Sequence, residues 1–267
     1  MIESPRIQEH LVTPEIAKQW LVKNVSNRKV SPPLVERYAR DMGAGNWELN
    51  GETVKFDSSR RLIDGQHRLS AIIKSGKSCK LYVATGLPTS YKVAATIDNG
   101  RSRSAADVLR MNGYSHHTRM AAIARFVMQL KSDKYNHGSV GNYEILEEVK
   151  KSPNEYERAA FQSKQVSGIA TVPPYGAFAM QAYEQSPEAF SSWHEKFTTG
   201  AGLQSGTAIL TVRNHLLRMK ALGHTRKTAF RYDVYAKLCF AWNMARKGKS
   251  CKRIEIPAKT FGIIELL

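Results

Sequence analysis

Five residues with reactive side chains or special backbone freedom follow one another between two apolar segments. In the stretch LIDGQHRLSAI, residues 62–72, they are Asp64, Gly65, Gln66, His67 and Arg68. The pattern predicts a strand that ends near the aspartate, a tight turn at the glycine and a helix that begins directly after it. The first N–H groups of such a helix lack partners within it, and the helix dipole makes this end positive. We therefore predict that this turn binds phosphate, from a nucleoside triphosphate or from DNA.

Each side chain of the turn has a role in this prediction. Arg68 can hold phosphate oxygens in a bidentate manner, and Gln66 can bind an amide or orient a water molecule. His67 can donate a hydrogen bond or transfer a proton near neutral pH. Asp64 can bind a metal ion such as Mg²⁺ or accept a proton. A purely structural alternative stays open, in which Asp64 caps the helix and pairs with Arg68 four residues later.

A second polar cluster lies at residues 96–107, TIDNGRSRSAAD. Asp98 ends a short apolar segment, and Arg103 flanks a helix start at which Ser104 and Asp107 have capping-box spacing. If this turn lies beside the first one, acids and arginines from both turns form an anion site with room for a metal ion. An ordinary capped turn with exposed arginines is the alternative.

The chain is strongly basic, and the excess charge is unevenly distributed. It has 267 residues, with 40 Lys and Arg against 23 Asp and Glu, a net charge of +17. Residues 213–267 alone have 13 basic and 3 acidic side chains. This clustering favours a polyanionic partner over a uniformly solvated basic surface, which is the alternative. We predict that the phosphate backbone of DNA is contacted by Arg213, Arg218, Arg226, Lys227, Arg231, Arg246 and Lys247.

Cysteine usage and hydropathy restrict the class of protein. The three cysteines are scattered, and no two have the Cys-x-x-Cys spacing of a zinc site. No apolar run approaches the ~18 residues of a membrane span, and the N-terminal residues lack the pattern of a secretory signal. We therefore expect a cytoplasmic protein, in a bacterium or a phage-infected cell, without a membrane partner.

Helical and strand patterns alternate up to about residue 113, and helical patterns dominate from residue 116. Thr13-Pro14 and Ser31-Pro32-Pro33 have the composition of helix starts. Residues 52–56, 61–63 and 80–86 have strand patterns. Farther along the chain, Ser152 and Glu155 again have capping-box spacing. The sequence therefore predicts a compact α/β unit followed by a helical region.

Several segments together resemble a known family. LIDGQHRLSAI, TPEIAKQWLVKNVSNRKV, TIDNGRSRSAADVLRMNGY and AWNMARKGK resemble the DGQHR-type ParB-like proteins of phages and bacteria, in the ParB/sulfiredoxin superfamily. The resemblance implies an α+β protein, with a small mixed-sheet domain over residues 1–115 and an all-α domain over residues 116–267. Gln66 and His67 stand where sulfiredoxins have their cysteine, so sulfiredoxin chemistry is not expected.

The resemblance also implies a ligand and further site residues. It implies that the turn at Gly65–Arg68 holds the phosphates of ATP or CTP, with Mg²⁺. It assigns nucleotide contacts to Asn27, Arg28 and Arg103, and it places Asp98 with Asp64 and His67 as candidate catalytic groups. The box has one arginine after the glycine, whereas partition proteins have two.

Three functions are compatible with these patterns. The first is a nucleotide-dependent DNA-binding protein, for which a homodimer is one expected state. The second is an enzyme, either a kinase-like phosphotransferase or a metal-dependent nuclease, acting on DNA or on a modified nucleoside. The third is a regulator that keeps the fold without the chemistry.

Overall fold

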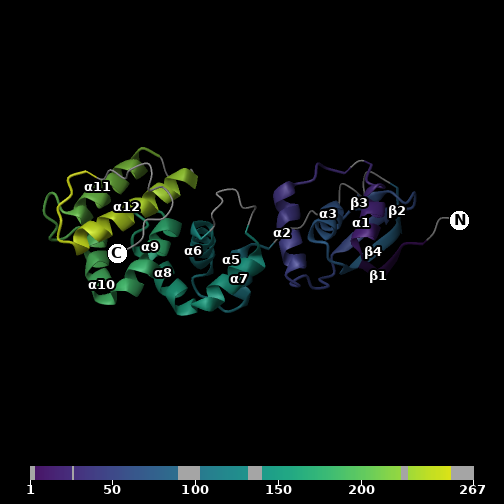
Figure 1. Cartoon of the computed structure of the whole chain (residues 1–267), viewed down its shortest axis with the longest axis horizontal. Helices are drawn as coiled ribbons and strands as arrows, with labels where there is room; N and C mark the ends of the chain where they lie inside the picture. The colour runs from purple at the N-terminus through teal and green to yellow at the C-terminus, as the bar shows by residue number, and fades with distance from the viewer. Residues whose placement is uncertain (1–3, 26, 90–102, 132–139, 224–227, 254–267) are drawn as a thin grey trace. The chain divides into compact units, whose positions relative to one another are not determined.

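The computed structural model describes residues 4–25, 27–89, 103–131, 140–223 and 228–253. These residues form a mixed α/β protein, mostly helical, with a four-stranded mixed sheet and 11 helices (Figure 1). The chain divides into two compact units, residues 1–102 with 136–143 and residues 103–135 with 144–267. The candidates Asp98, Arg226 and Lys227 lie outside the described residues.

The first unit is built on the mixed sheet. Its strands are β1 (Arg6–Val12), β2 (Thr53–Asp57), β3 (Leu62–Asp64) and β4 (Cys79–Leu87). They lie in the order β1-β4-β2-β3, with β2 parallel to β4 and the other two neighbouring pairs antiparallel. The helices of this unit are α1 (Pro14–Leu21), α2 (Pro32–Gly43) and α3 (Gln66–Ser75). They share one apolar core with the inward face of the sheet.

Strand alternation decides which side chains of the sheet enter this core. Val54 and Phe56 of β2 are buried in it, together with Val83 of β4. Lys55 lies between the two β2 residues and therefore faces the opposite side. Asp64 of β3 pairs in register with Lys55 and faces the same side. The period-two pattern thus places one cation and one carboxylate of the predicted site next to each other.

A buried aspartate closes the turn between β2 and β3. The Asp57 side chain is 2% exposed. Its carboxylate accepts hydrogen bonds from the N–H groups of Ser59 and Arg61, at 2.9 and 2.8 Å, and from the Arg61 guanidinium at 2.8 Å. Burial by itself raises the pKa of Asp57, but these hydrogen bonds and the Arg61 charge outweigh it and lower the pKa below its ordinary value. This turn fixes the path of β3 toward Asp64.

The described part of the second unit is built of helices, with one isolated antiparallel bridge between Thr207 and Ser250. Its helices are α5 (Ala105–Met111), α6 (His117–Leu130), α7 (Asn142–Lys151), α8 (Pro153–Gln165), α9 (Val172–Gln185), α10 (Pro187–Thr199), α11 (Ala208–Ala221) and α12 (Thr228–Arg246). Helix α5 packs on α6, so the structural division precedes residue 103, whereas the sequence patterns change near residue 116. No helix within the described ranges has both the length and the hydropathy needed to cross a bilayer.

Helix α9 is the centre of the second unit. It packs against α6, α8, α10 and α12. Gly176 permits the close approach to α6, because a Cβ atom there would lie 2.4 Å from Ile123 Cδ1. Phe178 of α9 joins a cluster of aromatic rings with Trp193 of α10 and Trp242 of α12. These rings form the core that positions α11 and α12, which have most of the predicted DNA-binding residues.

The two predicted capping boxes have different outcomes. At the start of α5, Ser104 and Asp107 form both reciprocal hydrogen bonds, so this prediction is confirmed. At the start of α8, the prediction is wrong, because Ser152 makes no side-chain hydrogen bond to the helix. Its backbone, at φ −151° and ψ 66°, departs from the usual geometry of a capping residue.

We expect the Asp57→Asn substitution to destabilise the first unit by about 1–3 kcal/mol, because it removes charge-assisted hydrogen bonds from a buried group. The pKa of Asp57 is lowered on folding, so its ionised form stabilises the protein above the ordinary pKa of 3.8, and this contribution is lost as the pH falls through the lowered pKa. Urea unfolding at several pH values compares the free energy of unfolding of the variant with that of the wild type. Pulsed hydrogen–deuterium exchange in the peptides of β2 and β3 reports on the first unit. The exposed Glu48→Gln substitution is the control, and an Asp57→Asn effect that does not change with pH would contradict this account.

Candidate functional site

The structure has the strand, turn and helix that the sequence predicts around Gly65. Strand β3 ends at Asp64 and α3 begins at Gln66. Gly65 has φ 103°, in the left-handed region. A Cβ atom at this position would lie 2.9 Å from Val54 Cγ2 and 3.1 Å from Val54 Cα. The turn therefore needs glycine both for its backbone conformation and for its contact with β2.

The residue at the cap position of α3 is Gly65, which has no side chain to accept a hydrogen bond from the first turn. The first backbone hydrogen bond of the helix runs from the Leu69 N–H to the Gly65 carbonyl, at 3.0 Å. The preceding N–H groups, those of residues 66–68, have no acceptor within the helix. With the positive end of the helix dipole, they form the kind of surface that binds an anion.

Arg68 lies in this first turn and is buried, with 8% of the residue exposed. Its Nη2 lies 3.3 Å from an Asp64 carboxylate oxygen, as the structural alternative predicts. Its Nη1 lies 3.5 Å from a carboxylate oxygen of Glu52, whose side chain is 63% exposed. Nη1 itself makes no hydrogen bond within the described part of the chain. The guanidinium thus keeps a buried donor for a further acceptor.

Lys55 adds a second cation to the site. Its Nζ forms an ion pair with the same Asp64 oxygen that Arg68 contacts. Lys55 was absent from the predicted site residues, although its place between two core residues of a strand next to the turn could have indicated it. Asp64 therefore pairs with two cations through the same oxygen, Oδ2.

The amide of Gln66 has a structural role in this arrangement. Its Oε1 accepts a hydrogen bond from Asn24 at 2.9 Å, and its Nε2 donates to the Arg28 carbonyl at 2.7 Å. Asn27 donates to the Leu62 carbonyl at 2.8 Å. These hydrogen bonds connect the segment after α1 to β3 and α3. Asn27 is thus next to the turn, whereas the Arg28 side chain is exposed.

His67 is also bound to the backbone. Its Nε2 accepts a hydrogen bond from the Ser31 N–H at 3.0 Å, directly before α2. This bond requires an unprotonated Nε2. The ring therefore fixes the start of α2 against the start of α3, and Nε2 is not available as a base while this contact persists.

The remaining predicted groups lie outside the described part of the first unit. Arg103 is exposed and belongs to the second unit, next to the capping box of α5. Asp98 lies outside the described residues. Within the described ranges, no group of three or more His, Cys, Asp or Glu side chains is arranged to hold a metal ion.

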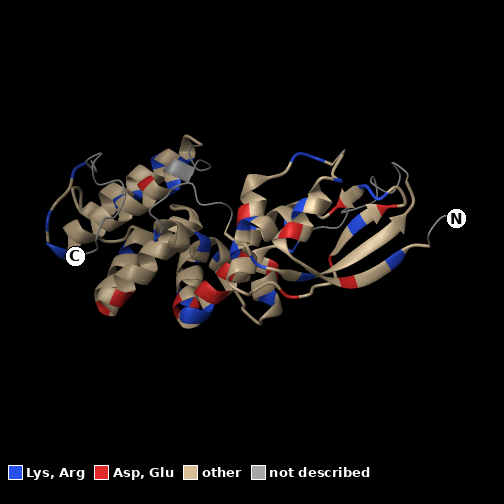
Figure 2. Ribbon diagram, turned by 45° about the vertical axis from the view of Figure 1, so that its right-hand side comes forward, with Lys and Arg blue, Asp and Glu red and all other residues tan. Residues whose placement is uncertain are grey.

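The predicted DNA-binding residues have different surroundings. Arg213 donates to the Phe197 carbonyl at 3.0 Å, near the end of α10, so it stabilises a helix terminus. Arg218, Arg246 and Lys247 are exposed, and Arg231 is half-buried. Figure 2 shows Lys and Arg (blue) on several helices of the second unit.

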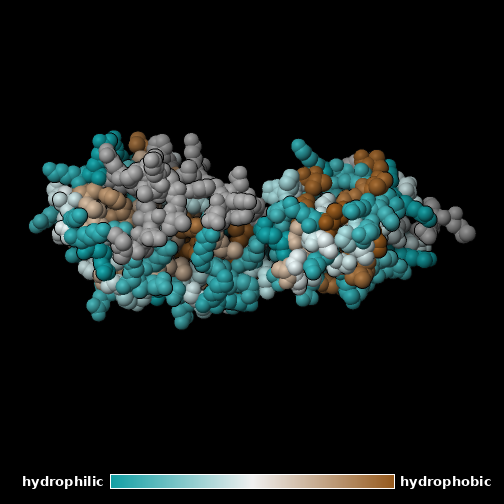
Figure 3. All heavy atoms as spheres, viewed as in Figure 1, coloured by the Kyte–Doolittle hydropathy of each residue, from teal (hydrophilic) through white to brown (hydrophobic). Residues whose placement is uncertain are grey.

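Apolar residues also reach the surface of the first unit, as the brown atoms among hydrophilic ones in Figure 3 indicate. Ile7 and Leu11 of β1 are 66% and 58% exposed. Both point away from the core, because they pair in register with Ala84 and Lys80 of β4. They share this outward face of the sheet with the Lys55–Asp64 ion pair.

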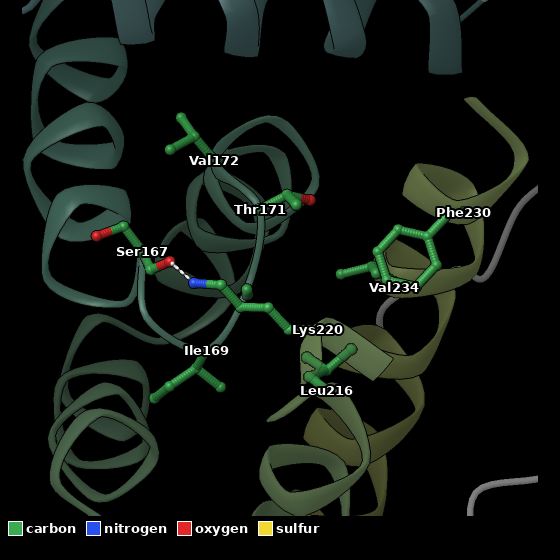
Figure 4. Close-up of a pocket in the computed structure, with 9 residues that line it drawn as sticks. Ser167, Ile169, Thr171, Val172, Leu216, Lys220, Phe230 and Val234 are labelled. Atoms are coloured by element: carbon green, nitrogen blue, oxygen red, sulfur yellow. Dashed lines mark hydrogen bonds between the residues drawn. The ribbon is translucent and has the colours of Figure 1, made fainter. Parts of the chain in front are cut away.

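The second unit has a hollow of about 260 Å³ between the start of α9, α11 and α12 (Figure 4). Val172, Leu216 and Phe230 make its lining mainly apolar. Lys220 crosses its edge and donates to the Ser167 carbonyl at 2.7 Å. The hollow suits an apolar group, and none of the predicted DNA-binding residues that the structure describes lines it.

Comparison with known proteins gives no match: no protein-family model, no curated protein and no solved structure matches this chain. The resemblance to the ParB/sulfiredoxin superfamily therefore depends on the quoted sequence segments and stays a prediction.

We expect the Gly65→Ala substitution to destabilise the first unit by about 2 kcal/mol or more, because it adds a clash with β2 to backbone strain. Gly76, at the other end of α3, is the matched control. It has φ 67° and no atom within 4 Å of an added Cβ, so Gly76→Ala should cost only about 1–2 kcal/mol. Urea unfolding measures both, and equal losses would contradict the close contact with Val54.

Proposed function

We propose that this chain is a nucleotide-dependent DNA-binding protein with a ParB/sulfiredoxin-like first domain, in which the start of α3 binds the phosphates of ATP or CTP. The observation that carries the proposal is the state of Arg68. Its guanidinium is buried in the first turn of a helix whose cap position is a glycine, and its Nη1 makes no hydrogen bond within the described residues. A phosphate oxygen is the acceptor that best completes such a group, because it is anionic and suits bidentate binding.

The local charges favour a polyanion that arrives from solvent. Arg68 and Lys55 share Asp64, and among the described residues the exposed Glu52 is the one other acid that contacts Arg68. A phosphate can replace the Glu52 carboxylate at Nη1 without disturbing the buried Asp64 pair. The site is thus assembled before the ligand binds, which lowers the entropic cost of binding.

Asp64 does not fit the role of a Mg²⁺ ligand. Its Oδ2 receives both cations, and the described residues offer no metal-binding cluster around it. When Mg²⁺ accompanies a triphosphate, it binds mainly through phosphate oxygens and water. We therefore assign no step of the proposed function to a metal ion on Asp64.

The same contacts favour binding over catalysis. A phosphotransferase or a nuclease needs a free base or a metal ion, whereas His67 Nε2 accepts a backbone N–H and Asp64 is paired with two cations. The basic excess of residues 213–267 supports DNA as the second partner. Among the described candidates, Arg218, Arg246 and Lys247 have the exposure that phosphate contacts need.

Calorimetric titration with ATP and CTP, with and without DNA, tests the nucleotide site. We expect Arg68→Met to weaken binding by about tenfold or more, which corresponds to the loss of one charge-assisted contact. Lys77→Met, directly after α3, removes one cation at the opposite end of the helix and is the control. Glu52→Gln should strengthen binding a few-fold, because it removes the anion that competes for Nη1. Absence of binding at millimolar nucleotide, or equal affinity of wild type and Arg68→Met, would contradict the proposal.

The salt dependence of DNA affinity tests the basic surface. We expect the logarithm of the binding constant to fall linearly with the logarithm of salt concentration, with a slope of about −0.9 for each phosphate contact. The pair Arg246→Ala and Lys247→Ala should make the slope less negative by about 1 to 2. Lys164→Ala with Lys196→Ala removes two exposed cations of the same unit and should leave the slope unchanged. A slope near zero for the wild type would exclude this mode of binding.

A further inference from the structure

A hollow of about 280 Å³ lies in the first unit at the carboxyl ends of β2 and β4. Phe56 and Val83 contribute to it from these strands, and Trp20 and Lys23 from the end of α1 and the residues after it. It differs from the α3 site, since Gly65 packs on Val54, near the start of β2. All residues that line it are described.

Aromatic rings form the apolar part of the hollow. Trp20 and Phe56 contact each other edge to face, with ring centroids 5.4 Å apart. His10 of β1 also contacts Trp20 edge to face, at 6.0 Å. The three rings come from three elements and hold one another in place, so they form a rigid aromatic platform with faces at steep angles, in which a planar ligand can lie against one ring and touch the edge of another.

Basic side chains surround this platform. Lys23 and Arg60 are exposed, and His10 is half-buried. The Lys23 ammonium lies 5.6 Å from the centre of the Phe56 ring. None of these three side chains has an ion pair or a hydrogen bond to a described residue. They therefore remain available for an anionic ligand.

The acid in the lining does not neutralise them. Asp57 is 2% exposed, and its carboxylate is bound to Ser59 and Arg61 within its own turn. Arg60 lies in the same turn with φ 59°, the one non-glycine residue with positive φ in the described part of the chain. Such a conformation costs about 1–2 kcal/mol for a residue with a side chain. A glycine would relieve this cost but would remove a cation from the hollow.

We propose that this hollow binds a nucleotide, with its base against Trp20 and Phe56 and its phosphate between Lys23 and Arg60. An aromatic platform beside basic side chains is the arrangement that recognises a base together with its phosphate. The volume lies near the lower end of the range for small-molecule sites, so the hollow suits one nucleotide unit. The same chemistry comes from a free mononucleotide or from one residue of single-stranded nucleic acid. This inference is independent of the triphosphate site at α3.

Titrations of the full chain with uridine monophosphate and with short single-stranded oligo-uridylate test the proposal. A monophosphate is chosen because it lacks the terminal phosphates proposed for the α3 site, and the titrations are repeated in Arg68→Met. We expect Lys23→Ala with Arg60→Gly to weaken binding by about tenfold or more. Lys18→Ala with Lys77→Ala removes the same charge from exposed positions outside the hollow and should change binding less than twofold.

Arg60→Gly also separates binding from folding. We expect it to leave the melting temperature unchanged or to raise it, because it relieves the positive φ, while the affinity falls. Photo-crosslinking with iodouridine forms of both probes then locates the base. Adducts should fall in the tryptic peptides of residues 19–23 and 56–60, which contain Trp20 and Phe56.

The two probes distinguish the sources of the ligand. Binding of both, or of the monophosphate alone, assigns the hollow to a nucleotide unit as such, and binding of the oligonucleotide alone assigns it to single-stranded nucleic acid. The proposal is overturned if neither probe binds at millimolar concentration, if the double variant and its control bind equally, or if adducts form elsewhere in the chain.

Discussion

The arrangement of the first unit depends on the burial of one guanidinium. Arg68 leaves water at the start of α3, and the loss of hydration has to be compensated by Asp64 and the more distant Glu52. Removing a partner from such a buried pair costs about 3–5 kcal/mol, so Asp64 is first a structural residue. The compensation is incomplete at Nη1, which has no hydrogen bond in the described part of the chain. The guanidinium thus stabilises the fold through Nη2, which contacts Asp64, and can bind an anion through Nη1.

The hydrogen bonds around this group keep it rigid. Gln66 ties the segment after α1 to α3, and His67 ties the start of α2 to the same turn. Gly65 lets the turn pack directly on β2. Polar residues that suggest reactivity in the sequence thus position the helix start in the structure. This arrangement is suited to a preorganised binding site, in which the backbone N–H groups and Arg68 keep their directions before the ligand arrives.

Local patterns predict much of this fold, and long-range contacts account for most of what they miss. The strand, turn and helix around Gly65 follow from local alternation and glycine chemistry, and the Thr13 cap before Pro14 is equally local. The two partners of Gln66 are 42 and 38 residues away and that of His67 is 36 residues away, so no local window of sequence contains them. Strand β1 was not predicted, because Ile7 and Leu11 point outward and only Val12, at its end, is buried in the core. Arg213 donates to a carbonyl near the end of α10, and residue type alone does not distinguish such a structural arginine from one that is free to contact DNA.

The central claim is that a phosphate group accepts hydrogen bonds from Arg68 and from the backbone N–H groups in the first turn of α3. Nitrogen-15 NMR of the full chain tests it directly, through the side-chain resonances of Arg68 and the backbone amide resonances of residues 66–68 during titration with a triphosphate. The account predicts that these resonances shift together, with one affinity, and that the Arg68 side-chain protons become protected from exchange with water. Resonances that stay unchanged at saturating triphosphate, while others in the chain shift, would contradict it.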